Sequence, residues 1–144
     1  MNMNTKVACI STDTSLASHL NAIDGFELDV GSPQEARPLL HKTHHDVVVL
    51  DIRNHHAALS LIEAIRRWQP GVRILLLVDD NSDEQTLMQL IFAGALGYLN
   101  QADIPSRLHT AVLAIQQNQA WVPRHIVSHF INALSTLKQH TALR

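Results

Sequence analysis

The chain has 144 residues, of which 46% are hydrophobic and 17% charged, and its formal net charge is −2 at pH 7. A chain of this length and composition can bury the core of one domain, which excludes a disordered protein. The small negative charge gives no electrostatic basis for binding nucleic acid through these residues. The one cysteine, Cys9, lies in an apolar run and cannot form a disulfide within the chain. We expect it to be a buried thiol in a protein of the reducing cytoplasm. No apolar stretch is long enough to span a bilayer, so no membrane contact is expected.

Apolar runs and helical spacings alternate along the chain. Strands are predicted at 6–11, 26–30, 45–50, 73–78 and 97–99, and the alternating pattern of 26–30 indicates an edge strand. Helices are predicted at 14–23, 32–40, 57–68 and 105–115, with a further one that begins after a cap at Asn81 or Ser82 and closes at Gly94. This strict alternation, with short connections, predicts an α/β fold with a doubly wound, five-stranded parallel sheet.

A further amphipathic pattern at 123–143 continues beyond the sheet unit, and its apolar residues include Phe130 and Leu134. Such a helix packs on its own domain, pairs with a second copy or links to another domain. We expect a homodimer, formed either through this final helix or through the face at 85–117. The final helix is favoured because its apolar stripe continues along the whole pattern.

The third predicted strand ends in an acid. Four consecutive apolar residues, Val47 to Leu50, indicate a strand that is buried on both faces, and Asp51 follows them. The carboxyl ends of the strands are where open α/β sheets place their chemistry. Asp51 is therefore the first candidate for a functional residue.

With Asp51 in place, the segment G-A-L-G-Y-L-N-Q-A-D-I-P-S-R-L from Gly94 to Leu108 resembles the receiver domain of bacterial two-component response regulators. The resemblance is nearest to the group that precedes a LuxR-type (NarL-type) helix-turn-helix. It implies a flavodoxin-like, CheY-like domain at 1–121 and a linker or dimerisation helix at 122–144. It also implies that the output helix-turn-helix is absent from this chain, and that DNA is bound only through that output domain.

The resemblance assigns roles to five positions. Asp51 matches the phospho-acceptor. The adjacent acids that bind Mg²⁺ in the family correspond to Ser11 and Thr12. The hydroxyl that binds the phosphoryl group corresponds to Val78, and the lysine that pairs with the phosphoryl charge corresponds to Gln101. Four of these five positions therefore lack the group that the reaction needs. Because phosphoryl transfer depends on electrostatic stabilisation, we expect the phosphorylation site to be degenerate.

Several expectations follow from that degeneracy. Mg²⁺ should bind weakly or not at all, with Asp13 as the weak candidate for a metal ligand, and the chain should not be an enzyme. The signal that the domain receives would then be dimerisation, a partner protein or a small ligand. As a separate point of the resemblance, Tyr98 matches the family's aromatic switch position. The alternative is a functional phospho-acceptor at Asp51, supplied by a histidine kinase, that uses Asp13 together with Asp79 or Asp80.

Two weaker patterns remain. Trp121 and Arg124 are similar to a W-x-[ST]-R motif with which some LuxR-type receivers bind cyclic di-GMP, although Pro123 stands in place of the Ser or Thr. The alternative is that Trp121 only anchors the final helix. His41, His44 and His45 lie close together in sequence, and we expect them to form a solvated loop cluster without a metal because their spacing is no recognised ligand pattern.

Overall fold

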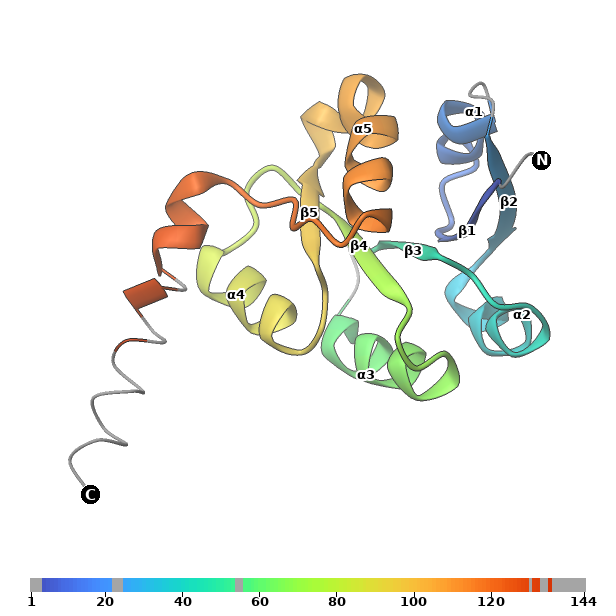
Figure 1. Ribbon diagram of the computed structural model, residues 1–144, viewed down its shortest axis with the longest axis horizontal. Coiled ribbons are helices and arrows are strands. Elements are labelled where there is room, and N and C mark those ends of the chain that lie inside the picture. The colour runs from blue at the N-terminus through green and yellow to red at the C-terminus, as the bar shows by residue number, and fades with distance from the viewer. Residues whose placement is uncertain (1–3, 22–24, 54–55, 130, 133–134, 136–144) are drawn as a thin grey trace.

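The computed structural model describes residues 4–21, 25–53, 56–129, 131–132 and 135. Five parallel strands form one sheet in the order β2-β1-β3-β4-β5 (Figure 1). The strands are β1 (Thr5–Ile10), β2 (Phe26–Gly31), β3 (Val47–Asp51), β4 (Arg73–Val78) and β5 (Gly97–Asn100). The prediction of a doubly wound, five-stranded parallel sheet is therefore confirmed.

Helices cover both faces of this sheet. Figure 1 shows α1 and α5 on one side and α2, α3 and α4 on the other. Their bounds are α1 (Ser15–Asn21), α2 (Ala36–Lys42), α3 (Ala58–Trp68), α4 (Glu84–Phe92) and α5 (Ile104–Gln116), and short 3-10 turns precede α2 (Pro33–Glu35) and α5 (Gln101–Asp103). This arrangement buries the central strands on both faces, as their unbroken apolar runs predict.

Alternate residues of each central strand enter different cores. On β3, Val48 and Leu50 join the core beneath α2, α3 and α4, whereas Val47 and Val49 join the core beneath α1 and α5. All four side chains are fully buried. β2 is an edge strand with exposed residues along it, as its alternating sequence predicts. The two cores fix β3 firmly, and with it the position of Asp51 at its end.

Two local predictions need correction. The N-cap of α4 is Asp83, not Asn81 or Ser82, because the Asp83 carboxylate accepts a hydrogen bond from the backbone N–H of Thr86. His45 is not part of a solvated cluster, because its side chain is fully buried. Its Nε2 lies 2.7 Å from Oδ2 of Asp29.

Gln69 explains why a polar ring tolerates burial at position 45. The Gln69 Oε1 atom accepts a hydrogen bond from the backbone N–H of His45, and its Nε2 lies 3.0 Å from Nδ1 of the ring. The same Nε2 donates to the carbonyl oxygens of Leu40 and Thr43. Burial of a polar group is tolerated when such partners satisfy it. This network joins the ends of α2 and α3 to the start of β3.

After α5 the chain crosses back over β5 and reaches α4 (Figure 1). The backbone of Trp121 pairs in parallel with Gly97, and the backbone N–H of Tyr98 donates to the Trp121 carbonyl at 3.0 Å. Residues 124–129 are helical, and Ile126 is fully buried in the core beneath α4. The predicted final helix thus packs on its own domain over this range, while Phe130 and Leu134 lie outside the described residues.

None of the helices in the described part of the chain has the length and hydropathy of a membrane span.

Candidate functional site

The candidate site lies where β1 and β3 end side by side. Ile10 pairs with Leu50 in the parallel register, so the next residues, Ser11 and Asp51, meet at the carboxyl edge of the sheet. The Ser11 hydroxyl donates a hydrogen bond of 2.6 Å to Oδ2 of Asp51, and it accepts one of 2.9 Å from the backbone N–H of Asp13. Ser11, where the resemblance led us to compare an acid, thus orients Asp51.

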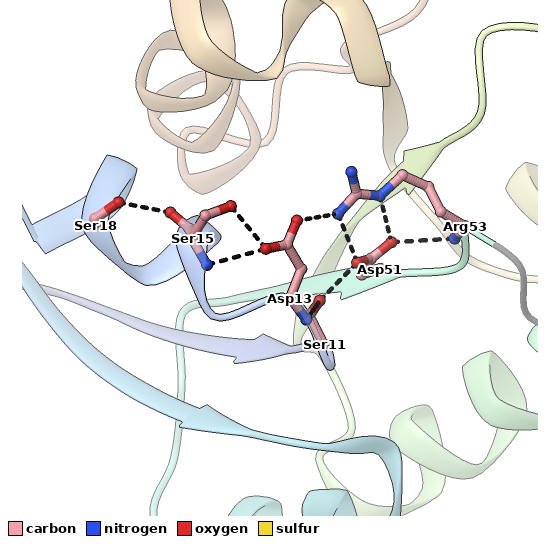
Figure 2. Close-up of polar contacts among 6 residues, drawn as sticks. All are labelled: Ser11, Asp13, Ser15, Ser18, Asp51 and Arg53. Atoms are coloured by element: carbon pink, nitrogen blue, oxygen red, sulfur yellow. Dashed lines mark hydrogen bonds and ion pairs between the residues drawn. The ribbon is translucent and has the colours of Figure 1, made fainter.

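An arginine completes the site. The Arg53 Nε atom donates to Oδ1 of Asp51 at 2.9 Å, and Nη2 donates to Oδ2 at 2.8 Å, which makes a two-point ion pair (Figure 2). The same Nη2 donates to Oδ2 of Asp13 at 3.0 Å. The backbone N–H of Arg53 also donates to Oδ1 of Asp51. The guanidinium therefore bridges the carboxylates of Asp13 and Asp51, and Asp51 is the position that the resemblance matched to the phospho-acceptor.

These contacts are largely shielded from water. The side chain of Asp51 is 8% exposed and that of Arg53 is 13% exposed, whereas Asp13 is 37% exposed. Burial raises the pKa of Asp51, but hydrogen bonds from Arg53 and Ser11 outweigh it and hold the pKa below its usual value of 3.8. Asp51 is therefore ionised at neutral pH, and its charge is already neutralised from within the chain.

Neighbouring groups share this electrostatic field. Hydrogen bonds from Ser15, and then the one from Arg53, lower the pKa of Asp13. The hydrogen bond to Asp51 raises the pKa of Arg53 above its usual value. Burial, and then the charges of Asp51 and Asp13, raise the pKa of the Cys9 thiol to about 12. Cys9 is therefore a protonated, buried thiol, as its apolar surroundings predict.

The site does not fit a magnesium ion. Mg²⁺ is held by carboxylate and water oxygens in an octahedral shell. Here a guanidinium, itself a cation, stands between the carboxylates of Asp51 and Asp13 and donates hydrogen bonds to both. Among the residues that the structure describes, no three His, Cys, Asp or Glu side chains gather in a way that could hold a metal.

The other positions that the resemblance marked are placed as follows. Val78 is buried at the end of β4, beside Asn100 of β5. Thr12 and Gln101 are exposed, and Gln101 begins the turn before α5. Tyr98 is 5% exposed and lies in the core beneath α4, where burial, and then the charge of Glu84, raise the pKa of its hydroxyl.

The acids after β4 do not point to a metal site either. The carboxylate of Asp80 accepts a hydrogen bond of 3.0 Å from the backbone N–H of Ala102, which ties the loop after β4 to the turn after β5. Asp79 lines a pocket of about 460 Å³ between α3 and α4, together with Asp83 and His56. The alternative in which Asp79 or Asp80 helps Asp51 to bind a cation has no support in these contacts.

A separate pocket of about 310 Å³ adjoins Trp121. Its polar lining comes from Asn100, Asp103 and Arg107. The Arg107 guanidinium carbon lies 6.0 Å from the centroid of the Trp121 ring, which is cation–π range. Arg124, the partner that the sequence motif indicated for Trp121, is exposed and is not among the residues that line this pocket.

Sequence reasoning missed Arg53 altogether. A signal was available, because the chain reads D-I-R from Asp51 to Arg53, and a cation two residues after an acid in a loop can fold back onto it. The D-I-R sequence becomes informative only in combination with Ser11 and Thr12, because neither residue supplies the acid expected there.

The five-stranded parallel sheet, with an acid at the end of its central strand, defines a flavodoxin-like α/β domain. No protein-family model and no curated protein matches the chain, but solved structures do. The isolated REC domain of RcsB from Salmonella enterica serovar Typhimurium, in the apo form, is 19% identical over 90% of this chain and 99% of its own, with a TM-score of 0.77.

Two further structures extend this likeness. A LuxR-family two-component response regulator from Aurantimonas sp. SI85-9A1 is 19% identical over 92% of this chain and 99% of its own, with a TM-score of 0.73. A structure of two RcsB dimers bound to two parallel DNAs is 18% identical over 87% of this chain and 67% of its own, with a TM-score of 0.70. At these identities the likeness shows the fold, and the chain has the fold of response-regulator receiver domains.

Proposed function

We propose that the chain is an atypical receiver, the signal-input domain of a LuxR-type transcriptional regulator, and that it works without phosphorylation of Asp51. The observation that carries this proposal is the two-point ion pair of Arg53 with Asp51. A phosphoryl donor and its cation would have to displace a guanidinium that already holds both carboxylate oxygens. Ser11, Val78 and Gln101 supply neither the acid nor the cation that the transfer would need.

The proposal includes the surroundings of the domain. The chain is a cytoplasmic signalling module without catalytic residues and without a bound cofactor. It acts as a homodimer and contacts DNA only through an output domain of the regulator. The receiver fold and the RcsB dimers on DNA support this reading by analogy. Its input is a partner protein, a small ligand or self-association, rather than a phosphoryl group from a histidine kinase.

Phosphorylation can be tested directly. The purified chain is incubated with Mg²⁺ and acetyl phosphate, and its intact mass is followed over time, with an ordinary receiver domain as the positive control. We expect no stoichiometric gain of a phosphoryl group. The Arg53→Ala variant shows whether the guanidinium alone blocks the site, and we expect it to gain little because Val78 and Gln101 are unchanged. Rapid, complete phosphorylation of the unmodified chain at Asp51 would overturn the proposal.

The pocket beside Trp121 favours one second candidate, binding of cyclic di-GMP. An aromatic ring, a guanidinium and the carboxylate of Asp103 line it, and these groups can stack on a guanine base and hydrogen-bond its edges. Arg107 holds the place beside the ring that the sequence assigned to Arg124. Isothermal titration with cyclic di-GMP decides the matter. Binding should be lost in Trp121→Ala and Arg107→Gln and kept in Arg124→Gln, and no heat of binding would exclude this candidate.

A further inference from the structure

Two histidines of the final helix converge on one carboxylate of α4. The Nδ1 atom of His129 lies 2.7 Å from Oε1 of Glu84, and Nε2 of His125 lies 3.8 Å from its Oε2. The two imidazole rings stand edge to face, with centroids 6.4 Å apart. Histidines four residues apart lie on one face of a helix, and here that face is turned toward the first residue of α4.

The carboxylate lies within reach of both rings. The side chain of Glu84 is 41% exposed, but its Oε1 atom is shielded from solvent. The Nδ1 atom of His129 lies 2.7 Å from this oxygen without the alignment of a hydrogen bond. The contact becomes an ion pair only when the imidazole carries a proton. Protonation of the ring therefore adds an electrostatic attraction that the neutral ring lacks.

The contact controls a segment with a defined place in the fold. Ile126, between the two histidines in sequence, is fully buried beneath α4, and Trp121 is paired with the edge strand β5. The apolar contact of Ile126 holds the helix on the domain, and the contacts of His125 and His129 with Glu84 add to it. Residues 124–129 are thereby held close to α4.

Other charged groups around the cluster do not cancel the effect. From α4, Asp83 lines the same pocket as Glu84 and His129 and adds a second negative charge. From β5, the Tyr98 hydroxyl feels the charge of Glu84, because burial and then that charge raise its pKa. On the final helix itself, Arg124 is exposed. Both histidines therefore face Glu84, and Asp83 adds negative charge on the side of His129.

We propose that Glu84, His125 and His129 form a proton-dependent latch, which holds the final helix on α4 when the histidines are protonated and loosens it when they are neutral. Histidine side chains change charge between about pH 5 and 8. Without Glu84, two protonated rings near a helix start would repel each other and oppose the helix dipole. The acid of α4 therefore reverses the sign of the pH response. The latch is independent of whether Asp51 accepts a phosphoryl group.

Hydrogen exchange of the backbone amides in residues 124–129 tests the latch. Wild type and Glu84→Gln are compared at the same pH, so that the intrinsic exchange rate cancels. We expect wild type to be protected about three- to tenfold more than the variant near pH 5.5, and the ratio to fall close to one near pH 8.5. A His125→Gln/His129→Gln variant should show no such pH dependence relative to Glu84→Gln.

Glu63→Gln, which removes an exposed carboxylate of α3, is the matched control and should leave the protection of residues 124–129 unchanged at both pH values. The loss of a helix-start charge in Glu84→Gln could shift protection equally at both pH values, and such a constant shift would count against the latch. If the ratio of wild-type protection to Glu84→Gln protection were the same at both pH values, whatever its size, the proposal would be overturned.

Discussion

Replacing Arg53 with Met tests whether the guanidinium holds the candidate site together. The change keeps most of the aliphatic side chain but leaves Asp51, 8% exposed, as a nearly buried charge whose remaining side-chain partner is Ser11. Removal of one partner from a buried ion pair costs about 3 to 5 kcal/mol. Because Asp13 is 37% exposed and contributes less, we take the lower end, about 3 kcal/mol. For a domain of this size that loss corresponds to a fall in Tm of roughly 10 °C.

Urea unfolding at neutral pH measures this free energy. Arg67→Met on α3, which removes an exposed guanidinium, is the matched control and should cost less than about 0.5 kcal/mol. The double variant Asp51→Asn/Arg53→Met should be more stable than Arg53→Met alone, because the uncompensated charge is then gone. Equal losses for Arg53→Met and Arg67→Met would show that the ion pair contributes nothing, and our account of the site would fail.

Three further outcomes are expected. The pKa values of Asp51 and Asp13 are lowered in the folded protein. Their contribution to stability is therefore present above their usual pKa of 3.8 and is lost as pH falls below it. Between about pH 6 and about pH 2, the free energy of unfolding should decline less in Arg53→Met than in wild type. Gly97→Ala would bring its Cβ to 2.4 Å from the Trp121 carbonyl oxygen, so we expect a loss of about 1 to 3 kcal/mol and faster exchange of the Tyr98 amide, and unchanged exchange would contradict this. Cys9, 1% exposed and with a pKa of about 12, should react with iodoacetamide only on unfolding, so labelling faster than unfolding would refute its burial.

The fold was largely predictable because its determinants are local. Unbroken apolar runs mark strands that helices cover on both faces, and the alternating residues of β2 mark an edge. The cap of α4 was less predictable, because Asn81, Ser82 and Asp83 are all residue types that cap helices. Only the hydrogen bond from Thr86 to Asp83 distinguishes them.

The site was predictable only in part, because its main contact is the ion pair of Arg53 with Asp51, which depends on side-chain geometry. From the sequence we expected Asp51 to lack metal-binding and phosphoryl-binding companions, but the sequence does not show what compensates its charge. Arg53 does so through side-chain geometry, which lets one nitrogen reach both Asp51 and Asp13. His45 was misjudged for a related reason, since Gln69, 24 residues away in sequence, satisfies it in the interior.

The pairing of Trp121 with Gly97 has a consequence for how copies of the protein meet. Strands at the margin of a sheet expose amides and carbonyls on which another chain can build. At one edge of the sheet, β2 carries Glu27 and Asp29, whose charges disfavour pairing with a strand of another chain. At the other, the returning backbone of Trp121 already engages β5. If the segment around Trp121 detached, the backbone of β5 would be free to pair with a strand of another copy. The pairing of Trp121 with β5 therefore also protects the protein against aggregation through its sheet edge.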